Sequence, residues 1–180
     1  MKASLFAGST ISVVGFAIFA TLLLCACVSD FQHRRIPNSV AGLLAASGMA
    51  YSAAASAKPA HALIISVGGL LFGLALWLPL YMVRWLGAGD VKLFAAAGAW
   101  LGPARTLDGA LIGAMAGGVL ALVWMLFAYG VTGTAATAAL AIANPRKIMN
   151  HTVDVKSRRA IPYGVALAFG AMAAALLPLA

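Results

Sequence analysis

Two carboxylates stand out in a chain that has very few acidic residues. All four acidic residues among the 180 are Asp, and two of them, Asp30 and Asp90, lie at the edges of long apolar segments. An ionisable group is costly inside a bilayer, so an acid retained at its edge is a candidate for chemistry. Two carboxylates that share one site repel each other, which favours one ionised and one protonated group. Such a pair can take a proton from water and give one to a peptide carbonyl, which is amide hydrolysis without a covalent intermediate.

The residues around Asp90 favour an approach of substrate backbone. Asp90 closes the motif Gly87-Ala-Gly89-Asp90, and Lys92 follows two residues later. Glycines permit unusual dihedrals and close contact with another backbone, and non-helical backbone at membrane depth is tolerated where it lines a cavity. The plainer alternatives remain open: Gly-Ala-Gly is a common turn, and Lys92 can extend its amine to the membrane interface.

The residues after Asp30 form a polar connector, Asp30-Phe-Gln-His-Arg-Arg-Ile-Pro37-Asn38. Asp30 lies near the end of the first apolar segment, and Asp90 lies near the start of a later one. If both segment ends lie on the same side of a membrane, the two acids can face one water-accessible cavity. The alternative for Asp30 alone is a helix cap or an ion pair with Arg34.

Composition places the chain in a membrane. Hydrophobic residues make up 63% of it, charged residues 9%, and the mean hydropathy is +1.00, which exceeds what a soluble domain of this length can bury. A hydrocarbon core of about 30 Å needs about 20 apolar residues per helix. We therefore expect an all-α polytopic bundle of about six transmembrane helices. The expected spans are 5–28, 40–57, 62–83, a short one at 91–101 that Gly102-Pro103 ends, 106–131 and 160–179.

The basic residues predict how the bundle is oriented. Most of the twelve Lys and Arg residues would lie on one side of a six-span arrangement, with Lys2, Lys58 and Arg105 on the other. Because cytoplasmic loops carry the excess of positive charge, both termini are expected outside, on the periplasmic side, and both acids on the cytoplasmic side. Asp108 is then expected to pair with Arg105. The net charge of +8 lies in short juxtamembrane loops, which favours contact with anionic lipids over nucleic acid.

No metal or cofactor is expected. The chain has two cysteines, Cys25 and Cys27, and three histidines scattered over loops without ligand spacing. We interpret the cysteines as small apolar residues of the first span. A removed signal sequence or a lipidated Cys27 is the less favoured alternative, because the first span leads directly into the Asp30 motif.

Two other features have structural interpretations. Glycines recur every four residues in two spans, a spacing that lets helices pack closely: Gly69 and Gly73, then Gly109, Gly113 and Gly117. The segment 132–159 is the longest predicted loop. Its first half, 132–143, is weakly apolar and either continues the preceding span or lies along the interface. Its second half is basic and is expected to fix topology.

Taken together, the motifs resemble those of one family. Asp30 followed by Pro37-Asn38, the Gly87-Ala-Gly89-Asp90-Val-Lys92 segment, and Ile161-Pro-Tyr-Gly164 near the last span occur in the order and spacing of the prepilin peptidases (type IV leader peptidases), which are polytopic aspartic proteases. The resemblance covers essentially the whole chain. It is closest to the short peptidases of tight-adherence (Flp) pilus systems.

The resemblance implies roles for individual residues. Asp30 and Asp90 would be the catalytic dyad, and Gly87 and Gly89 would admit the substrate backbone. Lys92 would tune the charge of the dyad. The remaining motif residues would shape the site or bind substrate, with helix initiation as the plainer role of the last three: Pro37, Asn38, Pro162, Tyr163 and Gly164.

The resemblance also implies a function. A single transmembrane peptidase domain over 1–180 would cleave the short basic leader from type IV or Flp-type prepilins and pseudopilins at the cytoplasmic face of the bacterial inner membrane. Its partners would be that substrate and the lipid bilayer, without nucleic acid. Larger members carry an insertion with paired cysteines and also methylate the product. The chain lacks both, so we expect cleavage without N-methylation, without zinc and without a separate soluble or methyltransferase domain.

Two other functions keep the acids but not the hydrolysis. A small proton-coupled transporter would place lone acids on a water path, and an inactive pilus-assembly scaffold would need no chemistry. Against a transporter, both acids are expected near one membrane face, and no inverted repeat is evident. The intact motifs argue against an inactive scaffold.

Overall fold

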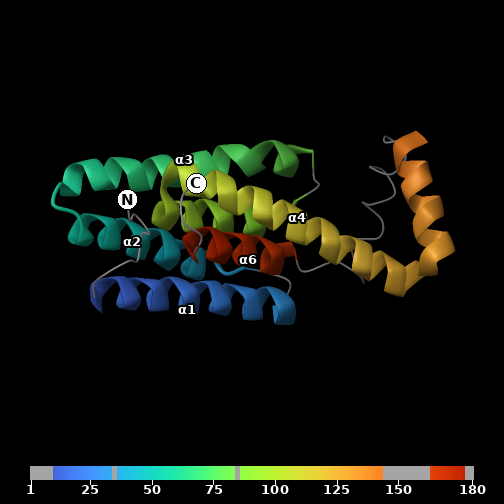
Figure 1. Cartoon of the computed structure of the whole chain (residues 1–180), viewed down its shortest axis with the longest axis horizontal. Helices are drawn as coiled ribbons and strands as arrows, with labels where there is room; N and C mark the ends of the chain where they lie inside the picture. The colour runs from blue at the N-terminus through green and yellow to red at the C-terminus, as the bar shows by residue number, and fades with distance from the viewer. Residues whose placement is uncertain (1–9, 34–35, 84–85, 144–162, 177–180) are drawn as a thin grey trace.

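The structure is a computed structural model that describes residues 10–33, 36–83, 86–143 and 163–176. Every regular element in these ranges is a helix: α1 (Thr10–His33), α2 (Asn38–Ala55), α3 (Pro59–Met82), α4 (Ala88–Ala143) and α6 (Tyr163–Leu176). The helices run side by side in a bundle, and the last part of α4 extends beyond it (Figure 1). The all-α class predicted from the sequence is confirmed.

Several helices have the length and composition of membrane spans. Within the described residues, three apolar segments are long enough to cross a bilayer: Val13–Asp30, Pro59–Met82 and Ala88–Val123. Gly164–Leu176 in α6 is a shorter apolar helix. Large apolar side chains are exposed along the outside of the bundle, which suits a lipid environment. The chain is therefore a membrane protein, while the number of spans and the side of the termini stay predictions.

The first helix is longer than its predicted span. α1 continues past residue 28 to His33, so Asp30 lies within its last turns rather than after its end. No proline or glycine interrupts residues 29–33, and Pro37 precedes α2 as its N-cap. Arg34, the alternative ion-pair partner of Asp30, lies outside the described residues.

The short predicted span is one limb of a helical hairpin within α4. A Cβ atom added to Gly73 of α3 would lie 3.2 Å from the Ala95 Cα atom and 3.3 Å from Thr106 Cγ2. In a straight helix Ala95 and Thr106 would be about 16 Å apart, so the chain has turned back between them, as Figure 1 shows. Gly102 has a φ of 70° at this turn, a value that glycine adopts without strain. The predicted break at Gly102-Pro103 is confirmed.

The returning limb continues further than the predicted fifth span. α4 extends to Ala143, so residues 132–143 are helical, and whether they continue the span or lie along the interface stays a prediction. Figure 1 shows this last part turning away from the bundle axis. The basic segment 144–159 lies outside the described residues.

Glycines allow the closest helix contacts, as predicted from their spacing. Gly69 of α3 packs against the backbone of Gly98 and Gly102, and Gly170 of α6 packs against the backbone of Gly109 and Gly113. A side chain at these positions would meet backbone rather than flexible atoms. The two limbs of α4 are therefore held between α3 and α6.

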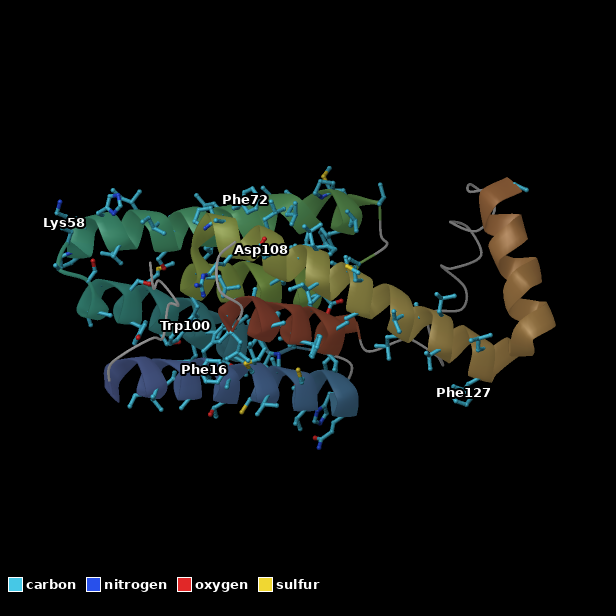
Figure 2. The ribbon with its side chains drawn as sticks, in the orientation of Figure 1. Phe16, Lys58, Phe72, Trp100, Asp108 and Phe127 are labelled. Carbon is cyan, nitrogen blue, oxygen red and sulfur yellow. The ribbon has the colours of Figure 1, made fainter. Side chains whose placement is uncertain are left out.

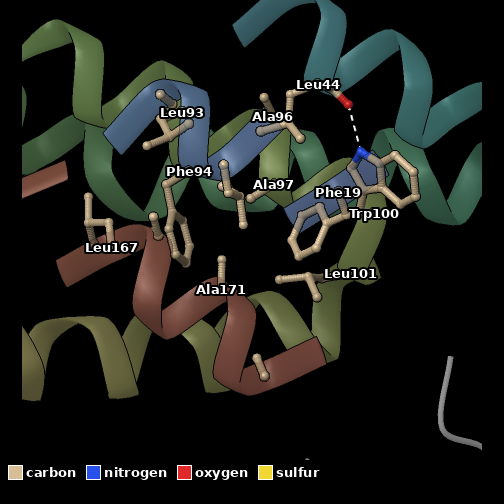
Figure 3. Close-up of a cluster of buried hydrophobic side chains, with 14 of the residues drawn as sticks. Phe19, Leu44, Leu93, Phe94, Ala96, Ala97, Trp100, Leu101, Leu167 and Ala171 are labelled. Carbon is tan, nitrogen blue, oxygen red and sulfur yellow. Dashed lines mark hydrogen bonds between the residues drawn. The ribbon is translucent and has the colours of Figure 1, made fainter. Parts of the chain in front are cut away.

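The core lies where α1, α2, α4 and α6 meet (Figure 3). Its largest buried side chains include Phe19, Leu44, Phe94 and Leu167. Trp100 lies in the same cluster, and its Nε1 donates a hydrogen bond of 2.7 Å to the Leu44 carbonyl oxygen. Figure 2 shows Trp100 in the interior and Lys58 at one end of the bundle. The core fixes α1, α4 and α6, the helices that carry the acids and the Gly164 motif.

Candidate active site

The last turns of α1 hold Asp30 on the inward face of the bundle. Phe19, Leu23, Ala26 and Asp30 are all buried and recur at helical spacing, so the acid continues the apolar stripe of the helix. The Asp30 side chain is 8% exposed. A buried carboxylate has lost most of its hydration, which is costly unless neighbouring groups compensate.

The first turn of α4 orients Asp90. The helix begins at Ala88, and the backbone N–H of Val91 donates to the Gly87 carbonyl oxygen at 3.3 Å. The Asp90 carboxylate in turn accepts a hydrogen bond from the backbone N–H of Gly87, as an acidic residue does in a capping box. Asp90 Oδ2 is the oxygen near Gly87, because it lies 3.2 Å from a Cβ added there. The other oxygen, Oδ1, is left to face α6.

Gly164, in the first turn of α6, brings the two acids together. A Cβ atom added to Gly164 would lie 2.8 Å from Asp30 Oδ2 and 3.0 Å from Asp90 Oδ1. Both oxygens are thus within 3.0 Å of one point, and their separation is at most twice that distance. The carboxylates are also close enough to interact electrostatically. The sequence prediction that both acids face one site is matched by this geometry.

The connector between α1 and α2 packs on the first turn of α4. A Cβ added to Gly89 would lie 3.3 Å from Ile36 Cβ, and Lys92 Nζ donates a hydrogen bond of 3.1 Å to Asn38 Oδ1. Pro37 caps α2, and its carbonyl oxygen accepts hydrogen bonds from the first turn of that helix. Gly89 therefore makes room for the connector of the protein itself, and its predicted contact with substrate stays a prediction.

The other predicted site residues lie at the start of α6. Tyr163 begins the helix, and Gly164 follows it. Pro162 lies outside the described residues. Gly164 is the residue of this motif that the structure brings to the acids.

Ile36 is a site residue that was not predicted. Its side chain is 9% exposed and packs over Gly89. The signal was present in the sequence, because Ile36 is the one apolar residue between His33 and Pro37. An apolar residue in an otherwise polar connector is expected to find a buried position.

Arg105 lies near the end of α6 opposite the two acids. Its side chain is 3% exposed, and Nη1 donates to the Ala175 carbonyl oxygen at 3.3 Å; this burial was not predicted, and its predicted side of the membrane stays a prediction. Its predicted attraction to Asp108 is also present. Among the described residues, no three His, Cys, Asp or Glu side chains gather as a metal site.

Comparison with known proteins gives a consistent assignment. Residues 17–122 match the type IV leader peptidase family, a range that contains both acids. Two proteins named prepilin leader peptidase/N-methyltransferase, from Burkholderia pseudomallei strains 1026b and K96243, are each 32% identical over 127 residues. The matched region covers 67% of this chain and 40% of each relative. No solved structure matches.

The family match and the relatives point the same way as the Asp30 and Asp90 motifs. The match covers more than half of the chain. The chain therefore belongs to the type IV leader peptidase family.

Proposed function

We propose that the chain is a membrane aspartic endopeptidase that removes the leader from prepilins and pseudopilins, with Asp30 and Asp90 as its catalytic pair. The observation that carries the proposal is the position of Asp30 Oδ2 and Asp90 Oδ1, both within 3.0 Å of one point beside Gly164. Family membership supports prepilin processing. The cleavage site lies at the cytoplasmic face of the bacterial inner membrane.

The geometry suits a direct attack by water, without a covalent enzyme intermediate. One carboxylate of the pair is ionised and takes a proton from a water molecule, whose oxygen bonds to the carbonyl carbon of the scissile peptide. The other carboxylic acid donates its proton to the carbonyl oxygen. When the C–N bond breaks, one acid gives its proton to the leaving amine, and the other takes a proton from a hydroxyl of the tetrahedral intermediate as the new carboxyl group forms. The two acids thereby return to their starting state.

Surrounding residues prepare Asp90 for this role. The Gly87 N–H holds one carboxylate oxygen of Asp90, which leaves the other oxygen turned toward Asp30. The hydrogen bond from Lys92 to Asn38 ties the first turn of α4 to the start of α2.

We further propose cleavage without N-methylation and a Flp-type substrate. The two relatives are named for both activities. Cys25 and Cys27 lie in α1, so the chain lacks the paired cysteines that the resemblance associates with methyl transfer. Mass spectrometry of the mature pilin tests this proposal, because a methylated N-terminus made by this protein alone contradicts it.

The test of the peptidase is co-expression with a Flp-type prepilin in a host that lacks its own prepilin peptidase. We expect the wild type to shorten the precursor on a gel, and Asp30→Asn and Asp90→Asn to leave it intact. Asp108→Asn is the matched control, because Asp108 is an exposed acid on α4 whose electrostatic partner is Arg105. Cleavage by both site variants, or none by the wild type, overturns the proposal.

A further inference from the structure

A small hollow opens between α1 and α6. Its volume is about 330 Å³, and its walls are Cys27, Val28, Gln32 and Val165. Val28 and Gln32 are exposed, whereas Cys27 and Val165 are half-buried. The hollow is therefore open to the surroundings on one side and reaches into the bundle on the other.

The inner wall of the hollow adjoins the carboxylate pair. Val165 directly follows Gly164, against which both acids pack. Cys27 lies one helical turn before Asp30 and interacts with it electrostatically. A peptide bond held at the two acids would place its neighbouring side chain at this wall.

The size and lining of the hollow limit what it can hold. A helix about 10 Å wide would fill 330 Å³ in less than one turn, so the space fits one or two side chains of an extended segment. Two valines and a thiol make its surface mainly apolar, and the aliphatic part of Gln32 adds to it. An apolar side chain gains free energy by leaving water there, whereas a charged one would lose its hydration.

We propose that this hollow is a specificity subsite that binds an apolar substrate side chain next to the scissile bond. The inference rests on the proposed peptidase function and adds a recognition element to the same site. The acids bind the peptide group, and the hollow selects the residue beside it. Val165 and Val28 set the size of side chain that is accepted, and Cys27 forms the wall nearest to the acids.

The first test measures cleavage of a prepilin series in which the two residues flanking the scissile bond are varied from Ala to Leu. For Val165→Phe, which fills the hollow, we expect cleavage of the Leu substrate to fall about ten-fold or more, and of the Ala substrate by less than about two-fold. Val14→Phe is the control, because Val14 is exposed on α1 far from Asp30. An equal loss on both substrates overturns the inference.

The second test does not depend on turnover. A prepilin with a single cysteine beside its scissile bond is mixed with an Asp90→Asn variant that keeps either Cys27 or Cys25 as its one cysteine. The mixture is then oxidised so that a disulfide can form between the two proteins. The cysteines are two residues apart on α1, and Cys25 is exposed, so the two point to different sides of the helix. We expect a disulfide to the substrate through Cys27 and not through Cys25.

The outcomes separate this inference from the function on which it rests. Equal cross-linking through both cysteines, or through Cys25 alone, overturns the subsite. A chain that cuts prepilins without regard to side-chain size keeps the peptidase function and loses only the subsite. A wild-type chain that cuts no prepilin overturns both.

Discussion

At one end of α6, the carboxylates of Asp30 and Asp90 pack against Gly164; at the other end, Arg105 donates a hydrogen bond to the Ala175 carbonyl oxygen. The signs of charge suit the helix at both ends, because a helix N-terminus favours anions and a C-terminus favours cations. The difference lies in what the charges do to each other. Arg105 has an attractive contact with Asp108, whereas the two acids repel.

This difference assigns separate tasks to the two ends. A buried cation with a carbonyl acceptor contributes to stability, and its replacement is expected to loosen the contact between α4 and α6. A pair of like charges held together costs stability, as groups arranged for catalysis often do. We therefore expect changes at the acids to alter cleavage and changes at Arg105 to alter folding.

Among changes that keep both acids, the largest effect is expected from Gly164→Ala. The new methyl group would occupy the point that lies 2.8 Å from Asp30 Oδ2 and 3.0 Å from Asp90 Oδ1. The acids must move apart, and a shift of about 1 Å in reacting groups can cost about 100-fold in rate. Cleavage of a prepilin in detergent measures the loss. Gly118→Ala is the control, since its added Cβ meets nothing within 4 Å; equal activity of the two variants would contradict the placement of the acids.

Arg105→Met tests the opposite end of α6. The variant keeps most of the apolar stem but removes the hydrogen bond to the Ala175 carbonyl oxygen. Losing a hydrogen bond from a charged group costs about 2 kcal/mol of unfolding free energy. Thermal unfolding in detergent measures the change, while kcat of the folded protein is expected to stay near that of the wild type. A normal melting temperature with a large fall in kcat would place Arg105 with the catalytic machinery.

Asp30→Asn tests the comparison between the two ends of α6 through thermal stability. At an alkaline pH that ionises both acids, replacing one carboxylate by a neutral amide of similar shape removes the repulsion between them, which is on the order of 1 kcal/mol. We expect this inactive variant to melt at a higher temperature than the wild type. A lower melting temperature would mean that the Asp30 carboxylate stabilises the fold more than the pair strains it.

The smallest effect is expected from Lys92→Met. The variant loses a solvent-exposed hydrogen bond to Asn38, and such bonds contribute about 1 kcal/mol. We expect kcat/KM to fall less than ten-fold, which is about that energy, with the acids still in place. Steady-state kinetics of Lys92→Met and of Asn38→Ala are compared, because two variants that remove the same hydrogen bond should have similar effects on kcat/KM. A loss as large as that of Gly164→Ala would give Lys92 a direct part in the chemistry.

Sequence periodicity and motif spacing predicted much of this arrangement. Apolar segment lengths indicated the helices, and Gly102-Pro103 predicted the break that becomes the hairpin in α4. The motifs predicted that Asp30 and Asp90 share a site. These features depend on local chemistry and on the direction of successive segments, which a sequence shows directly.

Contacts between distant segments were harder to predict. Ile36 packs on Gly89, and Arg105 bonds to the end of α6. The residues beside Ile36 and Arg105 in the sequence do not indicate these distant contacts. The burial of Arg105 depends on the turn at Gly102, which brings the basic residue under α6 rather than into a loop. Such contacts follow from the packing of the whole bundle and not from local pattern.

The hairpin in α4 has a consequence for the surrounding lipid. The limb from Ala88 to the turn at Gly102 is about 20 Å long. A bilayer core is about 30 Å thick. An element this short creates a hydrophobic mismatch, which a membrane relieves by thinning locally. Thinning brings the membrane–water interface closer to the carboxylates. The thickness of the host membrane therefore affects how readily water reaches the site.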